Sequence, residues 1–416
     1  MVINKLKHLS SDRFLRNVGW LGVAEIVNRI FRLATTVTLA RFLNAYDYGV
    51  ISIIYTIFDI GNVLTIRAGI GAKIIHAEEK DLKVVCDTSY WLNWILGISL
   101  FIFQCLVAYP LAFFYKNNGL ILPICAVGLI YLMMPIYTVQ STLIERENSL
   151  KITAIANAVQ SIVTNLMTVI LAWRGFGVWA VVLSMICSYI PWVVIILLNH
   201  SWRPPNRFTL DNWQQIASFG SKLLGVDLLS RVRMYLDYMI IGPFLGLEAL
   251  GMYFFAFNAG LGISQSVINA FTSALFPHLC AARNDKKELQ TQFFRSLKTI
   301  GLIVVPLVAL QITLAPFYVP IVFGQKWVPG IPILILICLS AIPLSLSRAT
   351  SQLLQAVDKT QVDLYWNLIF TVFFAASLLV AVQGGILWVA IAVLFTQLIA
   401  MPIFGIWVIR QVFGKR

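Results

Sequence analysis

Two acidic residues in apolar stretches of this chain are each followed, four positions later, by an arginine. The pairs are Glu25 with Arg29 and Asp227 with Arg231, and they are 202 residues apart. Residues at this spacing share one face of an α-helix and can form an ion pair along it. Ionisable side chains inside a membrane are unfavourable, and by default they mark a binding site or an ion pathway. The two pairs are therefore the first candidates for a functional site.

The stretches around these pairs belong to a chain with the composition of a membrane protein. Of its 416 residues, 59% are hydrophobic and 12% are charged, whereas about 25% are charged in an ordinary soluble domain. Apolar runs of about 20 residues, enough for a helix to cross a bilayer, recur along the whole chain. They predict an all-α polytopic membrane protein with twelve spans, at residues 18–42, 48–70, 90–114, 119–139, 152–173, 177–198, 216–241, 249–275, 299–322, 330–353, 362–382 and 386–409.

The net charge of +13 is distributed unevenly across the predicted membrane. Loops assigned to the outside carry only Arg41, Lys116, Arg174 and Lys326, and most of the other basic residues fall in loops on the opposite side. This asymmetry is the positive-inside rule, so we expect both termini in the cytoplasm. The excess charge is then explained by topology and by contact with anionic membrane lipids. No nucleic-acid partner is expected.

The acid–arginine pairs are part of a longer internal repeat. At the same offset of 202 residues, Leu21, Phe42, Leu43 and Gly49 recur as Leu223, Phe244, Leu245 and Gly251. At an offset of 210, Ser141, Leu143, Asn157, Gly175 and Ala180 recur as Ser351, Leu353, Asn367, Gly385 and Ala390. The repeat predicts two six-helix bundles, residues 1–201 and 202–416, related by a pseudo-twofold axis along the membrane normal. In transporters of this kind the binding site lies between the halves near the midplane.

Six arginines fall within the predicted spans: Arg29, Arg32, Arg67, Arg231, Arg233 and Arg348. Exposing all of them to lipid would cost about 15–20 kcal/mol, at about 2.5–3.5 kcal/mol each. They must therefore be paired with acids, reach the headgroup layer or line a water-filled cavity. We predict that they line a cavity and bind substrate. Arg67 and Arg348 lie near cytoplasmic ends, where snorkelling is the other interpretation.

The acids predicted to lie in the cavity are Glu25, Asp59, Asp227 and Asp237. Asp237 follows Arg233 by four residues and predicts another ion pair along the seventh span. Asp59 has no basic residue one turn away, so it is either paired across helices or protonatable. The acids are candidates for ion pairs in the cavity or for coupling to an ion gradient. The other interpretation of the pairs is that they only hold helices together.

No catalytic or metal centre is expected. The six cysteines lie mostly within or beside spans without a CxxC spacing, which is typical of packing residues. The four histidines fall at predicted span ends, and no second ligand stands at a metal-binding spacing.

Short motifs in a fixed order resemble a known family. They are Leu39-Ala-Arg-Phe-Leu43, Tyr46-Asp-Tyr-Gly49, Phe176-Gly-Val-Trp-Ala180, Leu236-Asp237, Ile240-Ile-Gly242, Ala249-Leu-Gly-Met-Tyr253, Phe276-Pro277 and Phe323-Gly-Gln-Lys-Trp327. The ordered set resembles the polysaccharide transport family of Wzx-type lipid-linked oligosaccharide flippases, within the multidrug/oligosaccharidyl-lipid/polysaccharide exporter superfamily. Many members of that family have fourteen spans, whereas twelve are predicted here.

The resemblance implies a flippase in the bacterial inner membrane. Its substrate would be an undecaprenyl-pyrophosphate-linked oligosaccharide for O-antigen, capsule or exopolysaccharide, moved by alternating access. Guanidinium groups suit a pyrophosphate because they stay charged and match phosphate oxygens with planar pairs of donors. No cofactor is implied, and coupling to a sodium or proton gradient is an expectation. Polysaccharide polymerase or chain-length proteins are the expected protein partners.

Three other functions stay open at this point. A cation or drug antiporter of the same superfamily would want more acids than arginines in its cavity, the reverse of the count here. A membrane polymerase or ligase would be expected to have a large external loop with catalytic residues, and the external loops here are short. A non-catalytic scaffold would not readily explain charges at matched depth in both halves.

Overall fold

In the computed structural model of the chain, the described residues are 31–32, 34–66, 70–211 and 213–414. They form helices joined by short turns, and no strand occurs among them. The predicted all-α fold is confirmed for this part of the chain. Glu25, Arg29 and Arg67 lie outside the described residues, as does the side chain of Asp227.

Contacts divide the described chain into two units. The first contains Ile53–Met234 and the described residues up to Leu43, and the second contains Asn44–Ser52 and the described residues from Tyr235 onward. This division differs from the boundary predicted at 201/202, since residues 202–234 group with the first unit. The predicted boundary separates the two sequence repeats and not two groups of contacts, so it stays a prediction.

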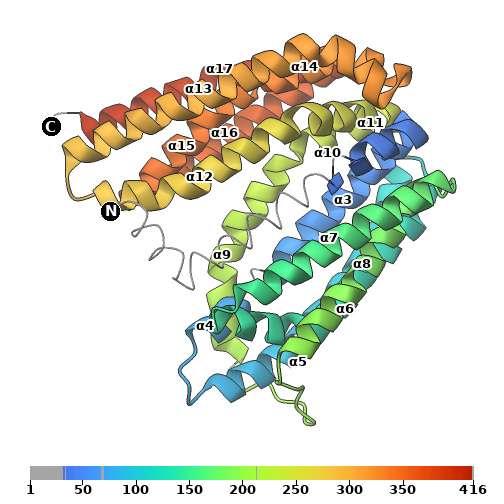
Figure 1. Cartoon of the computed structure of the whole chain (residues 1–416), viewed down its shortest axis with the longest axis vertical. Coiled ribbons are helices and arrows are strands. Elements are labelled where there is room, and N and C mark those ends of the chain that lie inside the picture. Colours follow the sequence, from blue (N-terminus) through green and yellow to red (C-terminus); the bar gives the residue numbers. More distant parts are fainter. Residues whose placement is uncertain (1–30, 33, 67–69, 212, 415–416) are drawn as a thin grey trace, which may run out of the picture. The chain divides into compact units, whose positions relative to one another are not determined.

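The first unit is built from long helices that run alongside one another (Figure 1). They are a first helix with the described residues 31–32 and 34–42, most of α3 (Ala45–Ile66), α4 (Ile70–His76), α5 (Leu82–Phe114), α6 (Ile121–Arg146), α7 (Leu150–Trp173), α8 (Val178–Asn199) and α9 (Trp213–Met234). A short 3-10 turn, η1 (Asn118–Leu120), precedes α6. Helix α5 packs against α6, α7 against α8, and α6 against α8. At the end of α6, Arg146 donates to the carbonyl oxygens of Ile74 and Ala77, 2.7 Å away in each case, and thereby caps α4.

The second unit holds the start of α3 and the remaining helices. These are α10 (Leu236–Leu245), α11 (Leu247–Ala256), η2 (Phe257–Leu261), α12 (Gly262–Ala282), α13 (Lys286–Tyr318), η3 (Val319–Phe323), η4 (Gln325–Gly330), α14 (Ile331–Leu339), α15 (Ala341–Ala356), α16 (Thr360–Ala381), η5 (Val382–Gly384) and α17 (Ile386–Phe413). One apolar core joins α12, α13, α15 and α17 through Leu279, Phe293, Leu353 and Phe404. These helices run alongside one another in Figure 1.

Nine helical stretches of the described chain are long and apolar enough to cross a membrane. They correspond to nine of the twelve predicted spans, and several are longer than predicted because helices such as α5 and α13 continue beyond their apolar part. The predicted span 18–42 is only partly described. Span 216–241 is divided at Tyr235 between α9 and α10, and span 249–275 is a continuous helix with the π-helical segment η2 inside it.

The internal repeat is confirmed in the backbone. Helix α6 ends at Arg146 and α7 begins at Leu150, while 210 residues later α15 ends at Ala356 and α16 begins at Thr360. In the turns between them, Asn148 and Asp358 both have a positive φ, 54° and 59°. Gly175 and Gly385, also 210 residues apart, have φ values of 80° and 93°. A shared left-handed residue at the same place in two turns is a strong sign of one structural unit used twice.

The offset of 202 also appears in the structure, at a crossing of α3 and α11. A Cβ atom on Gly49 would overlap the carbonyl oxygen of Leu247, and one on Gly251 would overlap the carbonyl oxygen of Ala45. Ala45 and Leu247 are the first residues of the two helices. Each repeat therefore contributes a glycine that allows the backbone of the other repeat to approach closely.

Candidate functional site

Arg231 on α9 forms an ion pair with Asp59 on α3. The Nη1 atom of Arg231 lies 3.2 Å from Oδ2 of Asp59, and the two side chains are 43% and 34% exposed. Charged groups with this much exposed surface are strongly unfavourable against hydrocarbon, so the pair requires a water-accessible space in the first unit. Asp59 was predicted to be either paired across helices or protonatable, and in the structure it is paired across helices.

Three tyrosines lie within electrostatic reach of the Asp59 carboxylate. Tyr55 stands one turn before it on α3, and Tyr131 and Tyr189 approach from α6 and α8. Tyr55 and Tyr189 are partly exposed, so their rings can stack on a sugar and their hydroxyls can hydrogen-bond to it, whereas Tyr131 is buried.

Gly61 creates the space for one of these tyrosines. A Cβ atom at this position would overlap the hydroxyl of Tyr131. That hydroxyl donates to the carbonyl oxygen of Phe58, 3.1 Å away, and the rings of Phe58 and Tyr131 are stacked with centroids 5.6 Å apart. Tyr131 is thus held in place beside the turn of α3 that carries Asp59.

Arg32 on the first helix joins the same region. It is exposed and lies within electrostatic reach of the Tyr55 hydroxyl. Thr35, one turn later, donates to Oδ1 of Asn165 on α7 at 2.5 Å, so this face of the first helix is turned toward α7. We refer to Arg32, Tyr55, Asp59, Tyr131, Tyr189 and Arg231 as the Asp59 cluster.

The structure thus brings together three predicted residues, Arg32, Asp59 and Arg231, and adds three tyrosines that were not predicted. The spacing of Tyr55 four residues before Asp59 was an available signal. Tyr131 and Tyr189 lie on other spans, and nothing in the sequence links them to Asp59.

The partners described for Asp237 are groups other than Arg233, with which an ion pair was predicted. Asp237 is buried, and its oxygens accept from the Tyr253 hydroxyl at 2.7 Å and from the backbone N–H of Tyr238 at 3.0 Å. Arg233 belongs to α9 and Asp237 to α10, and the interruption at Tyr235 removes the regular helical spacing on which the prediction relied. Asp237 connects α10 to α11 instead.

Arg348 lies in the second unit, on α15, with an exposed side chain. It is within electrostatic reach of Asp363 on α16, which is buried. Ser351 donates to Oδ1 of Asp363 at 2.8 Å, and the Asn367 amide donates to the same oxygen at 3.1 Å. Asp363 was not predicted, although Asn367, which belongs to the sequence repeat, lies one turn after it.

Among the residues that the structure describes, no group of three or more His, Cys, Asp or Glu side chains could hold a metal ion. Asn157 accepts a hydrogen bond of 2.9 Å from the indole of Trp192, which links α7 to α8.

Residues 38–332 match the family described as "Polysaccharide biosynthesis protein". Among curated proteins, the chain is 25% identical to the teichuronic acid biosynthesis protein TuaB of Bacillus subtilis, over 84% of this chain and 72% of that protein. It is 23% identical to the lipopolysaccharide biosynthesis protein WzxC of Escherichia coli, over 97% of this chain and 82% of that protein.

Solved structures share the fold. An inward-facing multidrug resistance transporter of the MATE family superposes with a TM-score of 0.77 at 15% identity, covering 95% of this chain and 98% of the transporter. The lipid II flippase MurJ in an inward closed conformation superposes with a TM-score of 0.77 at 13% identity, covering 94% of this chain and 88% of MurJ. The chain therefore has the fold of transporters of this superfamily, as the sequence motifs predicted.

Proposed function

Because the chain belongs to the polysaccharide biosynthesis protein family, we propose that it is a flippase that moves a lipid-linked oligosaccharide across the bacterial inner membrane. The finer proposal is that the lipid is undecaprenyl pyrophosphate and that the glycan is destined for O-antigen, capsule or exopolysaccharide. Support comes from relatives that take part in teichuronic acid and lipopolysaccharide biosynthesis. The fold shared with a lipid II flippase is consistent with it.

The observation that carries the proposal is the Asp59 cluster. Among the residues that the structure describes, Arg32 and Arg231 bring two guanidinium groups to a region with one carboxylate, and this charge favours an anion. A pyrophosphate offers planar sets of acceptors to both arginines. The partly exposed tyrosines Tyr55 and Tyr189 supply rings and hydroxyls for the sugars that follow the pyrophosphate, and the buried Tyr131 packs beside the turn that carries Asp59.

The ion pair gives this cluster a way to bind and release its anion. Asp59 competes with the substrate phosphate for the guanidinium of Arg231, so the anion is not held too tightly to leave. Protonation of Asp59, or a cation bound to it, would free Arg231 for the substrate. Coupling to a sodium or proton gradient through Asp59 is part of the proposal.

The predicted residues outside the Asp59 cluster are also part of the proposal. Arg29, Arg67, Arg233 and Arg348 are proposed as further substrate contacts, and Glu25 and Asp227 as ion-pair or coupling residues. Both termini are proposed to lie in the cytoplasm, and polymerase or chain-length proteins are proposed as partners.

An antiporter of cationic drugs is the second candidate, because a MATE-family multidrug transporter has the same fold. The balance of charge in the Asp59 cluster argues against it. A membrane polymerase or ligase finds no support, because the solved structures that share the fold are a multidrug transporter and a lipid II flippase.

Complementation tests the proposal in cells. A strain that lacks its own flippase would receive the wild-type chain, Arg231→Ala or Arg231→Lys, each at equal protein level in the membrane. We expect surface glycan with the wild type, little with Arg231→Ala and an intermediate amount with Arg231→Lys, because lysine keeps the charge but loses the planar pair of donors. Arg174→Ala, in an exposed turn after α7, is the matched control and should export normally. Full export by Arg231→Ala would contradict the role given to the cluster.

A further inference from the structure

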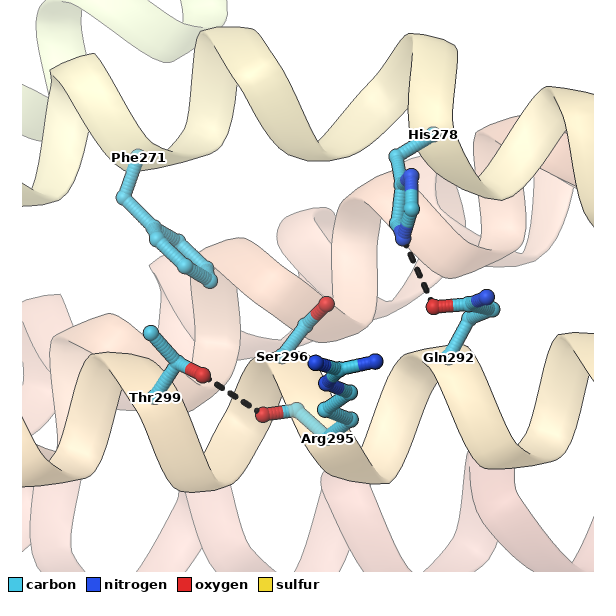
Figure 2. A pocket seen from close by; sticks show the side chains of 6 residues that line it. All are labelled: Phe271, His278, Gln292, Arg295, Ser296 and Thr299. Atoms are coloured by element: carbon cyan, nitrogen blue, oxygen red, sulfur yellow. Dashed lines mark hydrogen bonds between the residues drawn. The ribbon is translucent and has the colours of Figure 1, made fainter. Parts of the chain in front are cut away.

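A pocket of about 360 Å³ lies between α12 and α13, in the second unit. Phe271 and His278 of α12 line one side, and Gln292, Arg295, Ser296 and Thr299 of α13 line the other. Figure 2 shows His278 reaching toward Gln292, and the guanidinium of Arg295 standing in the gap beside Ser296. None of these residues belongs to the Asp59 cluster.

Two polar groups of the pocket already donate to acceptors within the protein. Nε2 of His278 lies 2.7 Å from Oε1 of Gln292, and an amide oxygen can only accept, so the imidazole donates there. The Thr299 hydroxyl donates to the backbone carbonyl of Arg295 at 2.9 Å. The exposed guanidinium of Arg295 has no ion pair with any carboxylate of the described residues. A permanently charged cation in a pocket is thus left without an anion.

The pocket lies where the helices leave the predicted membrane. The predicted span begins at Thr299, so Arg295 stands about one turn outside the hydrocarbon. The turn between the two helices adds Arg283, Lys286 and Lys287, and the charge distribution assigns this side to the cytoplasm. Basic pockets between membrane helices on the cytoplasmic side are suited to lipid headgroups.

The internal repeat gives an independent reason to expect an acceptor here. Helices α5 and α13 are both 33 residues long and carry the third predicted span of each repeat, and Thr88 and Trp91 lie as far from the start of α5 as Gln292 and Arg295 lie from the start of α13. In the first repeat this face is covered by the segment that follows α8.

In the first repeat, side chains of α5 donate hydrogen bonds to backbone carbonyl oxygens of the covering segment. The Thr88 hydroxyl donates to the carbonyl oxygen of Asp211 at 3.0 Å, and the indole of Trp91 donates to that of Arg207 at 2.9 Å. The equivalent face of α13 also presents a donor, Arg295, but borders the pocket instead of a covering segment. Its donor is a guanidinium, so the matching acceptor is an anion.

We propose that the pocket between α12 and α13 binds the phosphate group of a membrane lipid, with Arg295 as its cation and the hydroxyl of Ser296 as a further donor. The same chemistry is offered by two sources, the headgroup of an anionic phospholipid and the head of a polyprenyl pyrophosphate. Binding of the phospholipid does not depend on the proposed transport function.

Lipid binding to the full-length protein tests this proposal. The protein would be placed in phosphatidylcholine nanodiscs that contain either phosphatidylglycerol or undecaprenyl pyrophosphate, and the lipid that it retains would be titrated by native mass spectrometry. We expect Arg295→Gln to weaken retention of at least one of the two lipids by about tenfold or more, the loss typical of a charge-assisted hydrogen bond. The lipid affected identifies the source of the phosphate.

Two further variants decide the meaning of this result. Lys298→Gln removes an exposed positive charge of the same helix that does not line the pocket, and should change retention less than twofold. Ser296→Leu keeps every charge but fills the pocket, and should weaken retention as Arg295→Gln does. Unchanged binding of both lipids by Arg295→Gln, or equal losses with Lys298→Gln, would overturn the proposal. The readout is binding, so a failure of the transport function would leave it unaffected.

Discussion

At the scale of single residues, the chain uses its embedded acids in two different ways. Asp59 is partly exposed and pairs with an arginine of a distant helix. Asp237 is buried and bonded to a tyrosine hydroxyl and a backbone N–H. A partly hydrated ion pair can exchange one partner for a ligand, whereas a buried carboxylate with satisfied oxygens mainly holds its helices together. We therefore expect substitutions at the two acids to change different properties.

Substitutions of the ion pair should change substrate affinity in opposite directions. Arg231→Gln removes a guanidinium and should weaken binding of the lipid-linked pyrophosphate by about tenfold or more. Asp59→Asn removes the competitor for Arg231 and should strengthen binding while slowing export. Titration of purified protein with the lipid-linked substrate measures both effects, and Glu248→Gln, at an exposed acid of α11, is the control. Weaker binding by Asp59→Asn would show that the acid does not compete with the ligand.

Loss of the tyrosine that bonds Asp237 should lower stability. In Tyr253→Phe the buried carboxylate loses a hydrogen bond of 2.7 Å, which should destabilise the protein by about 1–3 kcal/mol. Thermal denaturation in detergent measures this as a lower Tm. Tyr365→Phe removes a hydroxyl from an exposed side chain on α16 and should leave the Tm unchanged. Equal Tm values for both variants would mean that the bond contributes nothing.

At the scale of helices, the apolar runs predicted most elements, and the errors have physical causes. The runs indicate the part of a helix that suits lipid, so they missed the polar extensions of α5 and α13. The apolar runs also predicted a single span where the structure has two helices, α9 and α10. Hydropathy does not detect an interruption at a single residue, here Tyr235. The pair predicted between Arg233 and Asp237 assumed the same continuous helix, so the interruption removes the spacing on which that prediction relied.

The crossing of α3 and α11 makes a prediction about glycines. Gly49→Ala and Gly251→Ala should each destabilise the protein by about 1–3 kcal/mol or more, because the added methyl group meets a backbone carbonyl that cannot move aside alone. Gly301→Ala on α13 is the matched control, since no atom lies within 4 Å of the added group. It should be neutral or stabilise the helix by up to about 1 kcal/mol.

Denaturation scans of the three variants compare these effects directly. A Tm for Gly49→Ala and Gly251→Ala equal to that of Gly301→Ala would contradict the close approach. Because the two glycines make equivalent contacts from the two repeats, we also expect their losses to be similar.

At the scale of the whole molecule, the repeat was the most informative feature of the sequence. It predicted that equivalent turns would recur, and Asn148 and Asp358 show that they do, down to a left-handed backbone. It could not predict how the site is assembled, since Arg231 belongs to the second repeat and pairs with Asp59 of the first. Such a contact depends on packing between spans far apart in the chain, which helical spacing does not contain.

The central claim is that the Asp59 cluster carries the charged head of a lipid-linked oligosaccharide across the membrane. The most direct test is translocation by purified protein in proteoliposomes, with an undecaprenyl-pyrophosphate-linked saccharide in one leaflet and a sugar-specific probe outside. The account predicts that the wild-type protein and the Arg174→Ala control will expose the saccharide to the probe, and that Arg231→Ala will do so at least about tenfold more slowly. Equal rates for Arg231→Ala and the wild type would contradict it.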